Sequence, residues 1–491
     1  MTVFPARPND DDNPCAALIY KRDITGARGS CVADQGTAGS RIADVVSAAR
    51  AADVRLIRFE YCDVSGVAHA KAVHVDQLEH KLLEGVGLTR AQMSINLLEQ
   101  VVPVADMEAV GEIRLVPDPA TFTVLPWSPG SASVLCDQLD HDRTDWGACP
   151  RSFLKKVIDR AAGMGITVQA TFENEYYLAT EVEGGFAPVD APTHSPVYSA
   201  IGHDHLDWLM LETVDALTAQ GIVVEQCINE YGPGQREISV RHTDALGAAD
   251  QQMKFRDTVR GVAAKHGILA SFAPKPFPDA IGSGAHVHLS LWDADGARSL
   301  LYDPAVPGGL SDLGRRFIAG VAEHLPALTA LTVPSHNSFR RLAPSSWASN
   351  TTAWGYDNRE AALRVASPFY QREEASYNLE YKVSDGSANP YLSLGALIAC
   401  GLDGILRELE PGEPSEHDPA TMSVEELERG HVRPLPTSMG DALDLLEADV
   451  VLTEALGPLL TRCYLAVRRS EHEAFSAADT AFEVRHHFYR F

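Results

Sequence analysis

The chain has 491 residues, of which 45% are hydrophobic, and a formal net charge of −26 at pH 7. This length can bury a large core and indicates two or three domains. The excess of acid argues against a nucleic-acid partner and against an anionic membrane surface, because both need a basic face on the protein.

The cysteines and the apolar runs bear on the cellular compartment. Eight cysteines form no Cys-x-x-Cys pair and lie largely inside apolar runs, which favours reduced thiols in a cytosol. The N-terminus lacks the basic and apolar regions of a signal peptide. The longest apolar run, residues 392–402, is shorter than the about 20 residues that a membrane span needs, and is predicted to be a buried helix. We therefore expect a soluble, cytoplasmic protein.

The first third of the chain predicts a small β-rich domain. Residues 1–40 are rich in Pro, Gly, Asp and Asn, and are predicted to form a flexible N-terminal extension. A hairpin is then expected from residues 55–61 and 70–75. Further strands are predicted at 112–116, 121–125 and 133–136. Together with one helix, these strands predict an N-terminal domain over residues 41–140.

The rest of the chain, residues 141–491, predicts a larger domain. Apolar residues recur with helical spacing in three stretches, 151–163, 204–220 and 244–266. Polar-lined strands lie between these helices. This order predicts an α+β domain whose mainly antiparallel sheet is flanked by helices.

Four polar clusters fall on predicted strands of the larger domain, and residues two apart on a strand share one face. Five carboxylates around one imidazole would repel each other without a cation among them. Hard oxygen ligands with one imidazole suit Mg²⁺ or Mn²⁺ better than Zn²⁺ or copper. Each cluster alone is more often a solvated strand face, but their conjunction predicts a metal site. The clusters are Glu173 with Glu175, Glu230 with Glu237, His286 with His288, and Glu380 with Lys382.

Phosphate groups would need other partners than a glycine-rich loop. The sequence has no Walker A motif and no dinucleotide Gly-x-Gly-x-x-Gly motif, so metals and arginines would have to hold phosphates. Arg359 and Arg364 suit this task, because the guanidinium fork matches phosphate oxygens. The competing interpretation is that both are ordinary surface arginines.

The clusters and several longer motifs resemble the glutamine synthetase family from about residue 45 to the C-terminus. The motifs are Cys-Pro-Arg-Ser-Phe-Leu at 149–154, Pro-Lys-Pro at 274–276, Asn-Ser-Phe-Arg-Arg-Leu at 337–342, Asn-Arg-Glu-Ala-Ala-Leu-Arg at 358–364 and Ser-Ala-Asn-Pro-Tyr at 387–391. The resemblance implies an N-terminal β-grasp domain and a catalytic domain. It implies ATP and two or three Mg²⁺ or Mn²⁺ ions per site. It also implies a homo-oligomer, a dodecamer of two hexameric rings, with each site between neighbouring subunits.

The resemblance also implies roles for individual residues. One metal would bind to Glu175, Glu230 and Glu237, and a second to Glu173, His286 and Glu380. Glutamate would be bound by Glu175, Gly282, Arg341 and Lys382, and the nucleotide by His288, Ser290, Arg359 and Arg364. The implied catalytic residues are Arg341, Arg359 and Glu380. The γ-carboxylate of glutamate would attack ATP, and an amine would then attack the acyl phosphate.

The chain departs from the ammonia-using members of the family where they bind ammonium. Their flap glutamate, six residues after the substrate-binding arginine, is replaced by Trp347, and residues 87–96 contain no aspartate. Lys382 stands where arginine is usual, and Ile281 where asparagine is typical. Trp347 offers an apolar or cation–π surface to an organic amine. The pattern of residues 347–359 resembles the γ-glutamylpolyamine and γ-glutamylanilide synthetases.

The sequence therefore predicts an ATP-dependent ligase that forms a γ-glutamyl amide from glutamate and an organic primary amine, which is aromatic, alkyl or a polyamine. A glutamine synthetase that uses ammonium and a catalytically silent structural or regulatory member stay open as alternatives. A polyamine would need a carboxylate beside Trp347 for its distal ammonium. Aniline or a short alkylamine would need apolar walls, which Leu97, Leu98 and Trp354 slightly favour.

Overall fold

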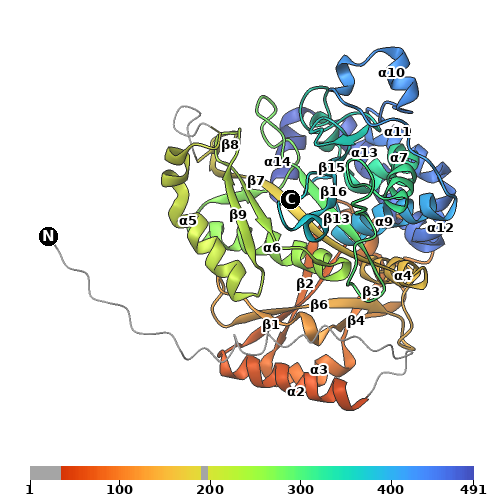
Figure 1. Cartoon of the computed structure of the whole chain (residues 1–491). Helices are drawn as coiled ribbons and strands as arrows, with labels where there is room; N and C mark the ends of the chain where they lie inside the picture. The colour runs from red at the N-terminus through yellow and green to blue at the C-terminus, as the bar shows by residue number, and fades with distance from the viewer. Residues whose placement is uncertain (1–34, 190–196) are drawn as a thin grey trace.

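The structure is a computed structural model that describes residues 35–189 and 197–491. It contains a six-stranded sheet in the N-terminal part of the chain and a ten-stranded sheet in the remainder (Figure 1). The α+β class, with an N-terminal β domain and a larger domain of sheet and helices, is confirmed.

The N-terminal sheet has the strand order β2-β1-β6-β4-β3, and β5 pairs with β6. The predicted hairpin is confirmed, because β1 and β2 pair antiparallel. In β1 the side chains of Ile57, Phe59 and Tyr61 alternate into the core. The helices α2 (Gln35–Ala51) and α3 (Leu78–Glu84) lie below this sheet in Figure 1. The strands are β1 (Leu56–Cys62), β2 (Ala68–His74), β3 (Val86–Thr89), β4 (Glu112–Pro117), β5 (Thr123–Val124) and β6 (Ser131–Leu139).

Two details of this part differ from the sequence prediction. Helix α2 begins at Gln35, so the boundary predicted at residue 40 falls inside a helix, and residues 1–34 of the predicted extension lie outside the described residues. The strand predicted at 121–125 is reduced to the two residues of β5. The reason is a 3-10 turn over Pro119–Thr121, whose N-cap Asp118 accepts a hydrogen bond from the amide of Ala120.

The large sheet has the order β14-β15-β16-β13-β7-β10-β9, with β8, β11 and β12 also pairing with β7. All of its described ladders are antiparallel except the one between β14 and β15, so the prediction of a mainly antiparallel sheet is confirmed. The strands are β7 (Ile166–Val182), β8 (Gly185–Pro188), β9 (Val224–Asn229), β10 (Gln235–Val240), β11 (Thr243–Asp244), β12 (Leu269–Ser271), β13 (Ala285–Asp293), β14 (Trp354–Tyr356), β15 (Leu363–Ala366) and β16 (Asn378–Tyr381).

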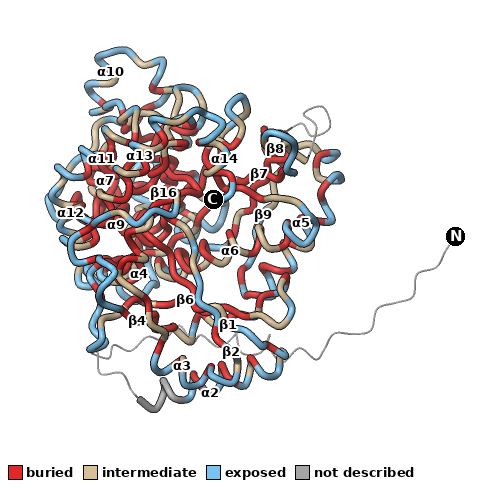
Figure 2. Tube along the Cα trace, turned by 180° about the vertical axis from the view of Figure 1, so that it is seen from behind, coloured by how far each residue is buried: buried red, intermediate tan, exposed pale blue. Residues whose placement is uncertain are grey.

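Helices pack beside the large sheet, and many buried residues gather around α4, α7 and α9 (Figure 2). The three predicted amphipathic helices are confirmed as α4, α5 and α6, and the predicted buried helix as α9. Helices α7 and α9 pack closely, because a Cβ at Gly320 would lie 2.3 Å from the carbonyl oxygen of Cys400. The bounds are α4 (Pro150–Gly163), α5 (Ala200–Ala219), α6 (Ala245–Lys265), α7 (Asp312–Thr332), α8 (Glu373–Ser376), α9 (Pro390–Leu406), α10 (Val424–Arg429), α11 (Met439–Ala448), α12 (Val450–Leu456), α13 (Pro458–Ser476) and α14 (Thr480–Arg490).

Helix lengths and hydropathy bear on the membrane question. Within the described residues no single helix is long and apolar enough to cross a membrane, although the bent pair α12 and α13 passes the same length and composition test when taken together.

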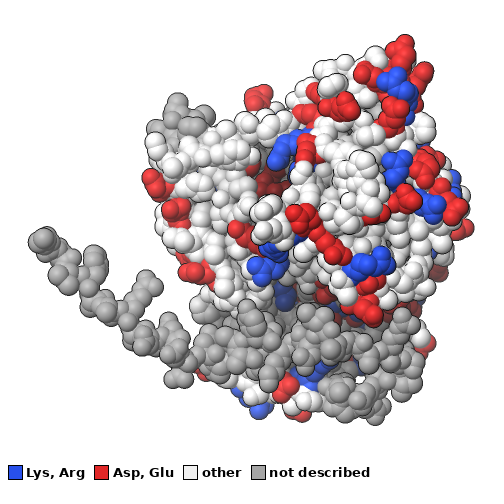
Figure 3. Space-filling view, in the orientation of Figure 1, with Lys and Arg blue, Asp and Glu red and all other residues white. Residues whose placement is uncertain are grey.

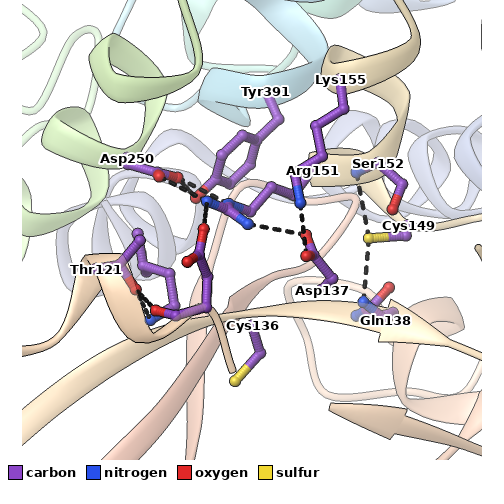
Figure 4. A network of polar contacts seen from close by, with 12 residues as sticks. Thr121, Cys136, Asp137, Gln138, Cys149, Arg151, Ser152, Lys155, Asp250 and Tyr391 are labelled. Atoms are coloured by element: carbon purple, nitrogen blue, oxygen red, sulfur yellow. Dashed lines mark hydrogen bonds and ion pairs between the residues drawn. The ribbon is translucent and has the colours of Figure 1, made fainter. Parts of the chain in front are cut away.

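A buried ion network around Arg151 joins the N-terminal sheet to helices of the larger part of the chain (Figure 4). Arg151, at the start of α4, is only 3% exposed. Its guanidinium donates to Asp250 of α6 at 3.0 and 2.8 Å, to Asp137 of β6 at 2.9 Å and to Asp118 at 2.9 Å. The hydroxyl of Tyr391 in α9 donates to Asp250 at 2.8 Å. Two carboxylates from the N-terminal part and one from the larger part therefore share one cation.

Candidate active site

The strand register brings the four polar clusters to one face of the large sheet. His286 of β13 lies opposite Glu173 of β7, and Glu175 lies opposite Glu237 of β10. His288 lies opposite Glu380 of β16. On β7 the two glutamates are half-buried while the residues between and beside them are buried on the other face. The alternation of side chains along β7 therefore places Glu173 and Glu175 on one face, as the sequence predicted. Figure 3 shows that this side of the molecule is hollowed near its centre, where acidic and basic side chains lie close together.

Glu173, His286 and Glu380 form a compact group that could hold a divalent cation. One ligand atom from each lies within 4.8 Å of the others. The Nδ1 atom of His286 is 3.2 Å from a carboxylate oxygen of Glu380 and 3.5 Å from one of Glu173. Burial opposes ionisation, yet the hydrogen bonds with His286 hold the pKa of Glu173 and of Glu380 well below the usual range. Two ionised carboxylates and one imidazole fit Mg²⁺ or Mn²⁺.

Glu175, Glu230 and Glu237 form a second set of carboxylates on the same face. Glu230 stands one residue beyond the end of β9, and Glu237 lies in β10. Burial, followed by the charge of Glu175, raises the pKa of Glu230 to about 7. Burial and the charges of Glu173 and Glu175 raise the pKa of Glu237 to about 11. Such crowding is unfavourable without a cation. Among the described residues, however, these three carboxylates do not come as close together as Glu173, His286 and Glu380 do.

His288, which the resemblance places on the nucleotide, lies directly beside the compact group. Its Nε2 atom is 3.2 Å from a carboxylate oxygen of Glu173, and its Nδ1 atom is 2.9 Å from the side-chain oxygen of Asn378. Although burial lowers it, the hydrogen bond with Glu173 raises the pKa of His288 to about 9. Ser290, two residues on, accepts a hydrogen bond from the indole of Trp292 at 2.8 Å.

Arg341 reaches the site beneath the glycine turn of residues 282–284. It is 6% exposed, lies 3.2 Å from Nε2 of His286 and donates to the carbonyl of Lys382 at 3.3 Å. Its Nη1 atom is buried without a hydrogen-bond partner among the described residues. A Cβ at Gly282 would lie 2.7 Å from Cγ of Arg341, and one at Gly284 would lie 2.7 Å from its Nη2. Glycine is therefore required at both positions for the guanidinium to approach.

The neighbouring Arg340 has a different role from Arg341. Its guanidinium donates to both carboxylate oxygens of Glu483 in α14, at 2.8 to 3.0 Å. The side-chain amide of Asn337 also donates to Glu483, at 2.7 Å. Of the two adjacent arginines, Arg341 lies beside His286, whereas Arg340 pairs with Glu483.

The remaining predicted cations lie around Glu380 or at the rim. The Nε atom of Arg364 donates to one oxygen of Glu380, and Nζ of Lys382 lies 3.3 Å from the other. Arg359 is exposed, and no ion pair joins it to another described residue. The structure thus brings Arg364 and Lys382 into the site and leaves Arg359 at its edge.

Trp347 belongs to a loop of unusual backbone conformation. Ser345, Trp347 and Ser349 have φ values of 52°, 59° and 58°, in the left-handed region that non-glycine residues rarely adopt. The ring of Trp347 is 44% exposed and packs edge-to-face on Tyr231, with 5.7 Å between centroids. Its backbone N–H donates to both carboxylate oxygens of Glu360 at 3.2 Å.

The apolar walls predicted from the sequence are wrong for two of three residues. Trp354 is buried in β14, and its indole donates to the carbonyl of Gly412 at 2.9 Å. Leu97 is buried in the second hydrophobic core, and Leu98 packs against the same core. The side chains of Trp354 and Leu97 therefore face packed interior and give no support to an apolar amine pocket, whereas Leu98 is only partly buried.

Sequence reasoning missed Gln235 and Glu360, although both lie within motifs that it singled out. The side-chain amide of Gln235 donates to Glu175 at 3.3 Å, to the carbonyl of Gly282 at 3.0 Å and to Ser283 at 3.1 Å. It thereby fixes Glu175 against the glycine turn. The signal for Gln235 was its place two residues before Glu237, on the same strand face.

Comparison with known protein families decides the identity of the chain. The glutamine synthetase N-terminal domain matches residues 38–150, and the glutamine synthetase catalytic domain matches residues 147–487. The chain belongs to the glutamine synthetase family. This family consists of carbon–nitrogen ligases that depend on ATP and divalent metal, and the metal-ligating groups described above are compatible with that requirement.

The names of similar proteins within the glutamine synthetase family point to different products. Gamma-glutamylpolyamine synthetase GlnA3 of Streptomyces coelicolor is 37% identical over 426 residues, covering 85% of this chain and 90% of the relative. Glutamine synthetase of Halobacterium salinarum is 33% identical over 442 residues, covering 89% and 94%. The solved structure of a GmaS/ADP complex matches with a TM-score of 0.79 and 30% identity, covering 90% of this chain and 98% of that chain.

Proposed function

We propose that this protein is an ATP-dependent ligase that joins glutamate to an organic primary amine as a γ-glutamyl amide. The observation that carries the proposal is Trp347, which stands where ammonia-using members have their flap glutamate. An indole has no charge to bind ammonium and cannot accept its proton. Its half-exposed ring, packed on Tyr231, instead offers an aromatic face to the body of an organic amine.

The proposed metal ligands would hold two divalent cations. Glu173, His286 and Glu380 would hold one, and Glu175, Glu230 and Glu237 the other. Bound Mg²⁺ or Mn²⁺ would neutralise the carboxylates and polarise a phosphoryl group. A third ion would have to use oxygens of the nucleotide, because both protein sets are then complete.

The remaining side chains would bind and orient the two substrates. Arg341, with its unpaired buried N–H groups, would bind a carboxylate of glutamate beside Gly282, Glu175 and Lys382. Arg359 and Arg364 would bind phosphate oxygens, and His288 and Ser290 would contact the nucleotide. We propose Arg341, Arg359 and Glu380 as the residues closest to the reacting atoms.

The proposed reaction has two steps. An oxygen of the γ-carboxylate of glutamate attacks the γ-phosphorus of ATP, and ADP leaves with the bond electrons. The neutral amine nitrogen then attacks the acyl carbon, inorganic phosphate leaves, and the nitrogen gives up a proton. Burial of Arg341, Glu380 and Lys382 keeps water away from the activated acyl group.

The ammonium-using alternative is supported by the similarity to the Halobacterium enzyme. A silent structural member is disfavoured by the complete set of metal ligands. We further propose a cytoplasmic homo-oligomer, a dodecamer of two hexameric rings, as the family resemblance implies.

Phosphate release from ATP tests the proposed function directly. With glutamate present, organic primary amines should support faster release than ammonium at equal millimolar concentration, because Trp347 supplies neither a charge nor a proton acceptor for the reacting ammonium. Aniline, short alkylamines and polyamines would form the panel. A wild-type enzyme that prefers ammonium over every organic amine would refute the proposal in favour of glutamine synthetase.

Trp347→Glu should shift the acceptor preference toward ammonium. The new carboxylate supplies a counter-charge and a proton acceptor, while loss of the indole removes roughly 1 to 3 kcal/mol of contact with the organic amine. The measurement is kcat/KM for both acceptors, and Trp347→Leu serves as a control for the loss of the ring alone. An unchanged ratio of the two kcat/KM values in Trp347→Glu would show that this side chain does not face the acceptor.

A further inference from the structure

The carboxylate of Glu360 is fixed beside Trp347 by a tight loop. Its two oxygens accept the backbone N–H of Trp347 at 3.2 Å. The N–H of Glu360 itself donates to the side chain of Asn358 at 3.0 Å. Asn358 is held in turn by the carbonyls of Ser415 and His417 at 2.8 and 2.9 Å. The position of Glu360 is therefore set by the fold and not by a charged neighbour.

Glu360 has no side-chain counter-ion. No ion pair joins it to a lysine, arginine or histidine in the described part of the chain. The nearest cation that acts on it, Lys382, lies 3.3 Å from Glu380, and the other charged neighbour, Asp418, is an acid. Burial and Asp418 leave Glu360 with a pKa above its usual value. A half-buried carboxylate in this state would gain from an added cation.

A row of aromatic rings leads from the metal ligands toward Glu360. Tyr231, next to Glu230 in the chain, lies between Tyr198 and Trp347, with centroid distances of 6.4 and 5.7 Å. All three rings are partly exposed. Methylene groups can lie along such faces, and an alkylammonium is attracted to them. Glu360 accepts the backbone N–H of Trp347, so its carboxylate lies next to the residue at one end of this row.

We propose that Glu360 binds a second, non-reacting ammonium group of the acceptor, so that the acceptor is an aliphatic diamine or polyamine. This inference rests on the proposed function. The reacting nitrogen has to reach an acyl phosphate at the proposed metal ligands, whereas the carboxylate of Glu360 lies at the backbone of Trp347. The far end of a longer amine can reach Glu360. The sequence slightly favoured aniline or a short alkylamine, because apolar walls were predicted around the acceptor. That preference is no longer supported, because Trp354 and Leu97 are core residues.

The experiment compares a diamine with a monoamine of equal chain length. Phosphate release from ATP with glutamate is measured against 1,4-diaminobutane and 1-aminobutane, with wild type, Glu360→Gln and the control Glu416→Gln. Glutamine keeps an oxygen that can accept the N–H of Trp347 but removes the charge. Glu416 is an exposed carboxylate of the neighbouring segment that holds Asn358. Glu416→Gln should leave the KM values for both amines unchanged.

In wild type the KM for diaminobutane should be about ten-fold or more below that for aminobutane, since a charge-assisted hydrogen bond supplies the difference. Glu360→Gln should raise the KM for diaminobutane by a similar factor and change that for aminobutane by less than about three-fold. Equal KM values for the two amines in wild type would overturn the inference without any variant. An equal rise in the KM for both amines in Glu360→Gln would also overturn the inference. Such a result would show that Glu360 only shapes the loop or meets the reacting nitrogen. Failure of the proposed function looks different, since ammonium would then be the best acceptor in wild type.

Discussion

Glu173→Ala should abolish turnover while leaving the fold intact. Glu173 contributes an oxygen to the compact group with His286 and Glu380 and is also the partner of His288. Loss of a residue that only supports a metal ligand costs about 10- to 100-fold, so loss of a direct ligand should lower kcat by more than about 100-fold. The side chain lies on the cavity face of β7, so the core face is unaffected. Phosphate release and far-UV circular dichroism measure the two outcomes, and His286→Ala should behave in the same way.

Metal binding gives this prediction a second readout. A cation that binds only the folded state raises the melting temperature with its concentration. We expect Mn²⁺ to stabilise wild type and to stabilise Glu173→Ala much less. Glu183→Ala, which removes an exposed carboxylate just beyond the end of β7, is the matched control and should respond like wild type. Near-normal turnover in Glu173→Ala would contradict the metal assignment.

Arg151→Ala should lower the free energy of unfolding more than any other substitution described above. The substitution leaves Asp118, Asp137 and Asp250 close together without their shared cation (Figure 4). Removing one partner of a buried ion pair costs about 3 to 5 kcal/mol, because the remaining charge is left uncompensated. Urea unfolding followed by fluorescence measures the change in the free energy of unfolding.

Lys155→Ala is the matched control for this network. Lys155 also pairs with Asp137, at 2.6 Å, but its side chain is 35% exposed. An exposed pair contributes about 0 to 1 kcal/mol, so this variant should stay close to wild type. Similar losses in the two variants would show that Arg151 acts by ordinary packing and not as the common counter-ion.

Strand alternation made much of the proposed metal-ligand set predictable. Glu173 and Glu175 share a face because they are two residues apart on one strand, and the same holds for His286 and His288. The sequence could not show which strands are neighbours. The register that sets His286 against Glu173 comes from tertiary pairing of β13 with β7.

The acceptor side was much harder to predict, because loops form it. Glu360 reaches Trp347 only through the left-handed turns of residues 345–349 and the bonds of Asn358, and no periodicity encodes such a path. Trp354, in contrast, lies on a regular strand, and its predicted place in a pocket was wrong. An aromatic residue near a functional motif is as easily core as pocket, and only the pairing of β14 with β15 decides between the two.

The pair of Arg340 and Glu483 gives the last helix of the chain an influence on glutamate binding. Arg340 and Asn337 both fasten to Glu483 of α14, and Arg341 follows directly in the chain. The guanidinium that we propose for substrate binding therefore depends on a docked C-terminal segment. For protein production, an affinity tag at the C-terminus or a deletion of α14 would disturb this anchorage.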